Sequence, residues 1–110
     1  MRQDSRTLKE LELLLKQEIQ LYEDYLATLI EEEKWVTRFK QDKIQALTIS
    51  RAKLCEQMLA AQDQRLRIMR TFPVNEGMRL RDLVIKFYPP REAKRVLPLI
   101  DRLRLSLIHI

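Results

Sequence analysis

A shortage of turn-forming residues limits what this chain can fold into. It holds one glycine and four prolines among 110 residues. Tight reversals depend on glycine, proline, asparagine and aspartate, so a chain poor in glycine and proline has few places to change direction. Long helices joined by short turns satisfy this restriction, and 110 residues suffice for one domain with a modest core. We therefore predict an all-α fold.

Charge and cysteine content indicate where such a protein would work. The net charge is +5, with acidic residues concentrated in residues 1–34 and basic residues in 35–110. This separation favours internal ion pairing over nucleic-acid binding. The lone cysteine, Cys55, excludes an internal disulfide, suits a reducing compartment and is expected to be a small buried apolar group. Without a signal peptide or an apolar run of membrane-spanning length, we expect a soluble, cytoplasmic protein.

Two long helices are expected before the first proline. The first is predicted over about residues 6–39, the second over about 43–71, with a tight turn between them. At the first start Asp4, Ser5 and Thr7 can each cap, and Thr7 has capping-box spacing with Glu10. At the second start Asp42 has the same spacing with Gln45. The apolar residues of both helices alternate at spacings of three and four, which is typical of an antiparallel coiled coil.

The polar interruptions of the two apolar stripes predict a register. Folding the chain at residue 41 or 42 brings the two glutamates in the first stripe opposite the two arginines in the second. The opposed pairs are Glu32 with Arg51 and Glu18 with Arg65, and Phe39 faces Ile44 beside the turn. Polar seam residues select register because a slipped pairing would place a charge against leucine. We predict a hairpin in this register.

The remaining chain is predicted to cover the hairpin. A loop at 73–77 separates the hairpin, residues 1–72, from a C-terminal helical segment, residues 73–110. Pro90 can open the last helix at its first position, whereas Pro98 should kink that helix or delay its start. The expected architecture is one domain overall, an elongated antiparallel helical hairpin plus a C-terminal helical segment, forming a coiled-coil-like three-helix bundle.

No catalytic constellation is evident in the sequence. The consecutive carboxylates of residues 31–33 point about 100° apart on a helix and cannot share one site. The Glu-x-x-His pairs of di-metal bundles and a glycine-rich phosphate loop are both lacking. We therefore expect a protein that is not an enzyme and that uses no metal or cofactor.

The segments LELLLKQEIQLYEDYLATLIEEEKWV and IQALTISRAKLCEQMLAAQDQR, joined by a turn with Asp42, share a helical rhythm with a known family. This pattern resembles the FlgN family of flagellar export chaperones over about residues 8–70. The corresponding positions are Tyr22, Leu26, Leu29, Glu33, Asp42, Leu47, Lys53, Leu54 and Arg65. The later stretch LRDLVIKFYPPREAKRVLPLIDRLR resembles the family's connecting stretch and the start of its last long helix.

The resemblance implies a cytoplasmic chaperone for the hook-associated proteins FlgK and FlgL. Such a chaperone binds their disordered, amphipathic C-terminal segments and delivers them to the flagellar type III export gate. The candidate cargo-binding residues are Leu83, Phe87, Val96, Ile100 and Leu103, with Arg95 and Arg102 orienting the partner. The alternative for each apolar residue is ordinary core packing. Two other functions stay open: a structural coiled-coil adaptor that self-associates, and a small basic regulator of nucleic acid.

The final stretch has a separate interpretation. Residues 105–110, LSLIHI, look like the translation of a transposon mosaic end. We therefore expect the natural sequence to depart from this chain near Arg104 and the last helix to continue, with His109 carrying no function. The alternative is a genuine short C-terminus packed on the bundle.

Overall fold

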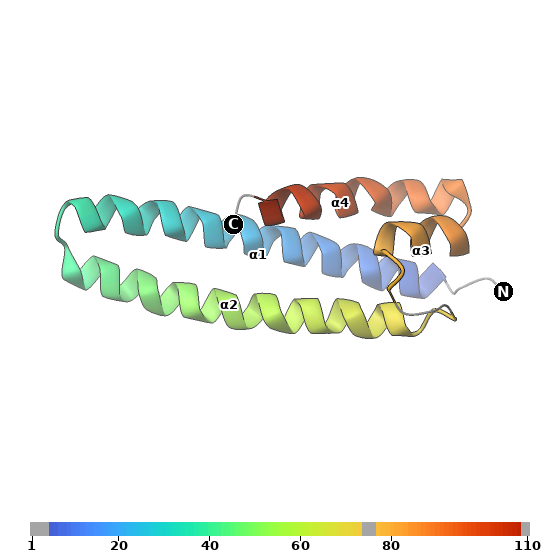
Figure 1. The fold of residues 1–110 in the computed structure, drawn as a ribbon, viewed down its shortest axis with the longest axis horizontal. Helices are drawn as coiled ribbons and strands as arrows, with labels where there is room; N and C mark the ends of the chain where they lie inside the picture. Colours follow the sequence, from blue (N-terminus) through green and yellow to red (C-terminus); the bar gives the residue numbers. More distant parts are fainter. Residues whose placement is uncertain (1–4, 74–76, 109–110) are drawn as a thin grey trace.

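The computed structural model of the chain describes residues 5–73 and 77–108 and shows four helices there (Figure 1). These helices are α1 (Ser5–Thr37), α2 (Gln41–Arg70), α3 (Leu80–Phe87) and α4 (Pro90–Ile108). They form a rod of 58 × 22 × 21 Å. The predicted all-α, elongated fold is confirmed. In the described part of the chain, no helix is long and apolar enough to cross a membrane.

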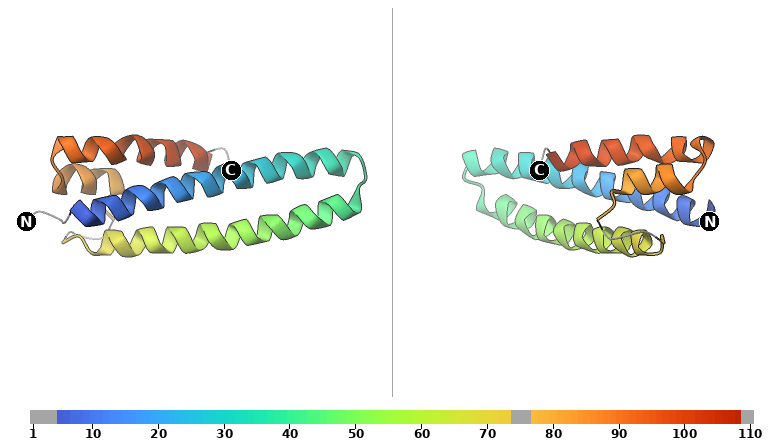
Figure 2. Two further views of the ribbon diagram at one scale, coloured as in Figure 1. Left: turned by 180° about the vertical axis from the view of Figure 1, so that it is seen from behind. Right: turned by 45° about the vertical axis from the view of Figure 1, so that its right-hand side comes forward.

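Helix α1 lies between two neighbours, α2 on one side and α4 on the other (Figures 1 and 2). Helix α2 returns antiparallel to α1, whereas α4 runs in the same direction as α1 and ends near its middle. The third layer consists of two helices, because the chain reverses at Pro89-Pro90 and α3 packs beside α4. The half of the hairpin nearer the α1–α2 turn is thus left with two layers.

The predicted register of the hairpin is confirmed by both polar pairs. Arg65 Nε donates a hydrogen bond of 2.9 Å to Glu18 Oε2. Further along the seam, Arg51 Nη2 lies 3.4 Å from Glu32 Oε1. Two ion pairs separated by about four helical turns cannot form together in a slipped register, so they define a single alignment of α1 against α2.

The caps predicted at Thr7 and Asp42 and the predicted turn contact are wrong. Lys40, not Asp42, precedes α2, and its side chain forms no capping hydrogen bond. Asp42 lies in the first turn instead, where its charge still interacts favourably with the helix dipole. Thr7 lies inside α1, which begins two residues earlier. Phe39 does not face Ile44 in the seam, because α1 ends before it and its side chain is 90% exposed.

The hydrophobic core occupies the three-layered end of the rod. Its buried members in the hairpin lie within residues 8–22 and 61–72, and no residue from 23 to 60 is buried. Phe72, just beyond α2, packs against Phe87 at 5.4 Å and Tyr88 at 6.2 Å between ring centroids. Cys55 is half-buried rather than buried, because it lies outside this core.

The prolines behave partly as predicted. Pro90 is the first residue of α4, as its fixed φ and missing N–H favour. The helix continues through Pro98, so the predicted delayed start is wrong. Pro98 is exposed, and its position near the middle of α4 leaves the carbonyl one turn earlier without its usual backbone donor.

Exchanging the charges of Glu32 and Arg51 tests the register. Either single change, Glu32→Arg or Arg51→Glu, places like charges opposite each other and should lower the free energy of unfolding by about 1 kcal/mol. The double variant should regain most of that loss, because the pair is restored in reverse. Urea unfolding of the four proteins measures the coupling. The alignment would be contradicted if the double variant lost as much free energy of unfolding as the two single variants lose together.

The buried carboxylate of Glu18 predicts a pH dependence. Burial raises the pKa of Glu18 above 4.5 even though Arg65 opposes the rise, and its Oε1 accepts no hydrogen bond. As the pH falls from 7 toward 4.5, Glu18 therefore takes up its proton in the folded state before the unfolded state does, which stabilises the fold. The stability of the wild type relative to Glu18→Gln should rise over this range in chemical denaturation. A constant or shrinking difference would contradict the prediction.

Candidate partner-binding surfaces beside α4

The apolar residues predicted to bind cargo come together, but as part of the core. Leu83, Val96 and Leu103 are buried, and Phe87 and Ile100 are half-buried against the same cluster. The physical reason is that the apolar stripes of α3 and α4 turn toward the largest apolar surface available, the hairpin. Because Leu83, Val96 and Leu103 are buried, a partner would reach these three side chains only after α3 or α4 moved.

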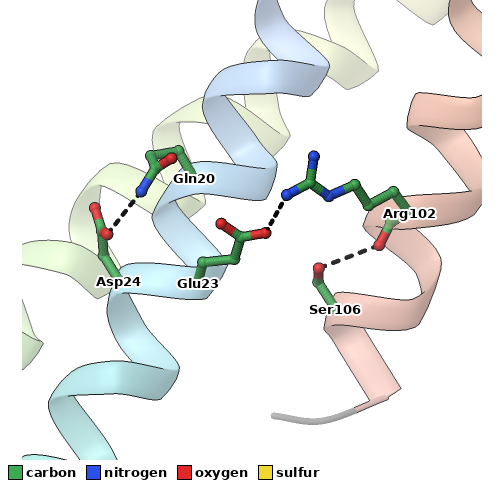
Figure 3. A network of polar contacts seen from close by, with 5 residues as sticks. All are labelled: Gln20, Glu23, Asp24, Arg102 and Ser106. Atoms are coloured by element: carbon green, nitrogen blue, oxygen red, sulfur yellow. Dashed lines mark hydrogen bonds and ion pairs between the residues drawn. The ribbon is translucent and has the colours of Figure 1, made fainter.

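The two arginines predicted to orient a partner hold α4 against α1. Arg95 Nη2 donates to Glu12 Oε2 at 3.1 Å, and Arg102 Nη2 donates to Glu23 Oε1 at 2.6 Å. Figure 3 shows the second contact bridging the two helices, with the Ser106 hydroxyl donating to the carbonyl oxygen of Arg102. Both arginines are exposed, so water competes for these pairs and each contributes little to stability.

A small hollow lies where α4 ends on α1. It has a volume of about 230 Å³ and is lined by Tyr22, Glu23, Leu26, Arg102, Leu105 and Ser106. Beyond this hollow the face of α1 that α4 covers continues without cover, because Ile30 follows Leu26 by four residues and is 62% exposed. We call Leu26 and Ile30, together with the hollow, the open α1 stripe.

A second concave surface lies on the other side of α4. This α3–α4 cleft has a volume of about 400 Å³ and is lined by Ile85, Tyr88, Pro90, Ala93, Lys94, Leu97, Pro98 and Asp101. Its lining is largely apolar, and Asp101 accepts a hydrogen bond of 2.9 Å from Arg81 Nη1. Such a surface suits an apolar side chain of a partner better than a charged small molecule.

Sequence reasoning did not find either surface, although a signal was present. Ile85 is an exposed apolar residue that falls beside the stripe facing the core, whereas Leu97 packs against the core at the edge of the cleft. Ile30 continues the apolar stripe of α1 beyond the point where the C-terminal helix runs out. An apolar residue left over after the core has been filled is the pattern that indicates such surfaces.

Among residues 5–73 and 77–108, no group of three or more His, Cys, Asp or Glu side chains is placed to hold a metal ion. His109 lies outside the described residues. No protein-family model, curated protein or solved structure matches the chain. The surfaces beside α4 and the sequence pattern are therefore the features that bear on function.

The placement of the candidate residues predicts two very different mutational effects. Leu103→Ala removes a buried side chain between α4 and the core and should lower the free energy of unfolding by about 2–4 kcal/mol. Arg102→Ala removes an exposed ion pair one residue away and should cost less than about 1 kcal/mol. Urea unfolding monitored by circular dichroism compares them. Similar losses in both variants would contradict this packing of α4.

Proposed function

We propose that the protein is a cytoplasmic chaperone that captures amphipathic helices, with the C-terminal segments of the hook-associated proteins FlgK and FlgL as its cargo. The open α1 stripe is the observation that carries the proposal, because within the described residues it is an apolar helix face with space beside it. The resemblance of residues 8–70 to FlgN-type chaperones supplies the cargo class and the delivery to the flagellar export gate.

Helix α4 illustrates the binding mode that we propose for cargo. It is an amphipathic helix that turns Val96 and Leu103 toward the hairpin and pairs its basic residues with carboxylates of α1. A cargo helix that continues along α1 would cover Leu26 and Ile30 in the same way. Glu33, exposed and three residues beyond Ile30, is placed to pair with a basic residue on its flank. This is recognition of a helix by a groove on a helical surface.

The shallowness of the surface suits a chaperone that must release its cargo. The half of the hairpin beyond Tyr22 has no buried residue of its own, so cargo would rest on two helices instead of entering a deep pocket. A disordered segment that folds on binding also loses conformational entropy, which keeps the affinity moderate. Cover of the cargo's apolar stripe would prevent premature assembly while leaving dissociation fast enough for export.

A second candidate function is a coiled-coil adaptor that self-associates. It is favoured by Leu59 and Leu66, two exposed leucines that are seven residues apart and therefore share one face of α2. Two copies joined through this face would bury both leucines. This function predicts a dimer whose formation depends on protein concentration and survives an excess of cargo peptide. Light scattering coupled to size-exclusion chromatography distinguishes it from the chaperone.

A peptide-binding experiment tests the chaperone proposal. Fluorescently labelled peptides from the C-terminal segments of FlgK and FlgL should raise their anisotropy on binding, whereas scrambled peptides of the same composition should not. Ile30→Lys should weaken binding by about ten-fold or more, because a lysine ammonium would enter the apolar contact. Leu13→Lys is the matched control: Leu13 lies on another face of the same helix and is similarly exposed, at 68%.

The outcomes separate the two functions. Binding that Ile30→Lys weakens and Leu13→Lys leaves unchanged supports capture along the open α1 stripe. The chaperone proposal fails if wild-type protein binds neither peptide, or if both variants lose binding equally. A concentration-dependent dimer without peptide binding would favour the adaptor.

A further inference from the structure

The end of the hairpin gathers basic and aromatic side chains. We call residues 34–43 the hairpin tip. Around the ring centre of Trp35 lie Lys34 Nζ at 5.2 Å, Lys43 Nζ at 5.4 Å and Arg38 Cζ at 5.6 Å. Lys40 is exposed in the turn itself. Cations at these distances are attracted to the face of the indole ring, which holds them close together despite their mutual repulsion.

The charges of the hairpin tip are not neutralised by the fold. Within the described residues, the four cations of the tip form no ion pair, whereas the arginines of the shaft discussed above all do. Two of the nearby carboxylates already make contacts with other side chains. Glu31 Oε1 accepts a hydrogen bond of 2.9 Å from Trp35 Nε1, and Glu32 pairs with Arg51. Glu33, which directly precedes the tip, and Asp42, which lies within it, are exposed. Residues 34–43 carry four cations and one carboxylate, Asp42, so the tip itself is net positive, and Glu31 and Glu33 just before it reduce that charge.

Phe39 occupies a position that the fold itself would fill better with glycine. Its φ is 54°, and the Lys40 N–H donates to the Trp35 carbonyl while the Phe39 N–H donates to that of Val36. This is the hydrogen-bond pattern of a Schellman motif, whose left-handed residue is usually glycine. Phe39 thus strains the backbone and exposes 90% of an aromatic side chain. Neither feature stabilises the folded chain, so an exposed phenylalanine at this position is better explained by contact with another molecule.

We propose that the hairpin tip binds the surface of an anionic lipid bilayer. Phe39 enters the interface between headgroups and acyl chains, and the surrounding cations contact lipid phosphates. An aromatic side chain and several basic residues are the two components that drive interfacial binding, one through apolar burial and the other through the negative surface potential. The chain needs no membrane-spanning helix for this mode of attachment.

The shape of the tip favours a bilayer over a folded acidic partner. Phe39 is 90% exposed and lies in the turn between α1 and α2, which Figure 1 shows at one end of the rod. A deformable interface accepts such an exposed ring without a matching pocket, whereas a folded partner would have to provide one. Attachment by the tip holds the rod end-on and leaves α4 and the open α1 stripe away from the surface. The inference is thus independent of the proposed cargo site.

Trp35 provides a direct readout, because it is the only tryptophan in the chain. The full-length protein is titrated with vesicles of phosphatidylcholine, with or without phosphatidylglycerol. We expect the Trp35 emission to shift to the blue and the protein to co-sediment only with the anionic vesicles, and increasingly weakly as salt is added. Wild-type protein that remains in the supernatant with anionic vesicles at low salt would overturn the proposal.

Phe39→Gly separates the role of the ring from its effect on folding. Glycine relieves the positive φ, so the Tm should stay the same or rise. Binding to anionic vesicles should nevertheless weaken by about five-fold or more, because the apolar insertion is lost. Ile49→Ser is the control, because Ile49 is also an exposed apolar residue and lies on α2 outside the tip. Unchanged vesicle binding by Phe39→Gly would overturn the insertion.

A pair of double variants tests the location of the charge. Lys40→Ser with Lys43→Ser should weaken vesicle binding by about 20-fold, since each basic residue near an anionic surface contributes about five-fold. Lys9→Ser with Lys53→Ser removes the same charge from the shaft and should change binding by less than about two-fold. Equal losses in both would overturn the tip as the site. Tip-dependent binding to polyglutamate, with none to anionic vesicles, would assign the tip to an acidic polypeptide instead.

Discussion

The carboxylate of Glu18 is completely buried, and only Arg65 from the opposite helix compensates its charge. Leaving such a carboxylate without its partner costs several kcal/mol, so a slip of α2 by one turn is strongly disfavoured. The same alignment brings Phe72, at the end of α2, beside the start of α1. Helices α3 and α4 then have a defined apolar surface to cover, and the core forms where they cover it. The register of the hairpin, and with it the position of the core, therefore depends on the pair of Glu18 and Arg65.

Within the described residues α4 covers only part of α1, and this mismatch divides the rod into two unlike halves. At the α4 end, three layers enclose a core that contains residues with no exposed surface. Toward the tip, two helices contact each other along one seam and leave Ile30 and Phe39 exposed. Two helices cannot bury their apolar faces without a further layer. We therefore expect the tip half to open locally more easily than the core half. The surfaces proposed for binding are concentrated where the fold lacks this cover.

The sequence was sufficient for the helices and their register but not for the surfaces. Seam pairing was predictable because a charge inside an apolar stripe has few satisfactory partners. The cap at Asp42 was not, because the chain reverses through backbone hydrogen bonds at Trp35 and Val36 that leave no recognisable side-chain pattern. The candidate cargo residues were chosen from the apolar stripes of α3 and α4, and these stripes pack in the core. Arg102 likewise pairs with α1. Finding the open surfaces required knowing where α4 ends.

The two proposed binding sites lie on different parts of the rod. The open α1 stripe lies along the side of the rod, where a cargo helix would continue the path of α4, and the hairpin tip lies at the end of that path. Cargo held on the stripe would therefore lie along the rod, with its axis pointing toward a membrane that the tip contacts. A protein whose charged and aromatic residues were spread evenly would provide no such orientation. Phe39 and the surrounding cations lie at the end of the rod away from the core. Only that end of the rod would therefore contact a membrane.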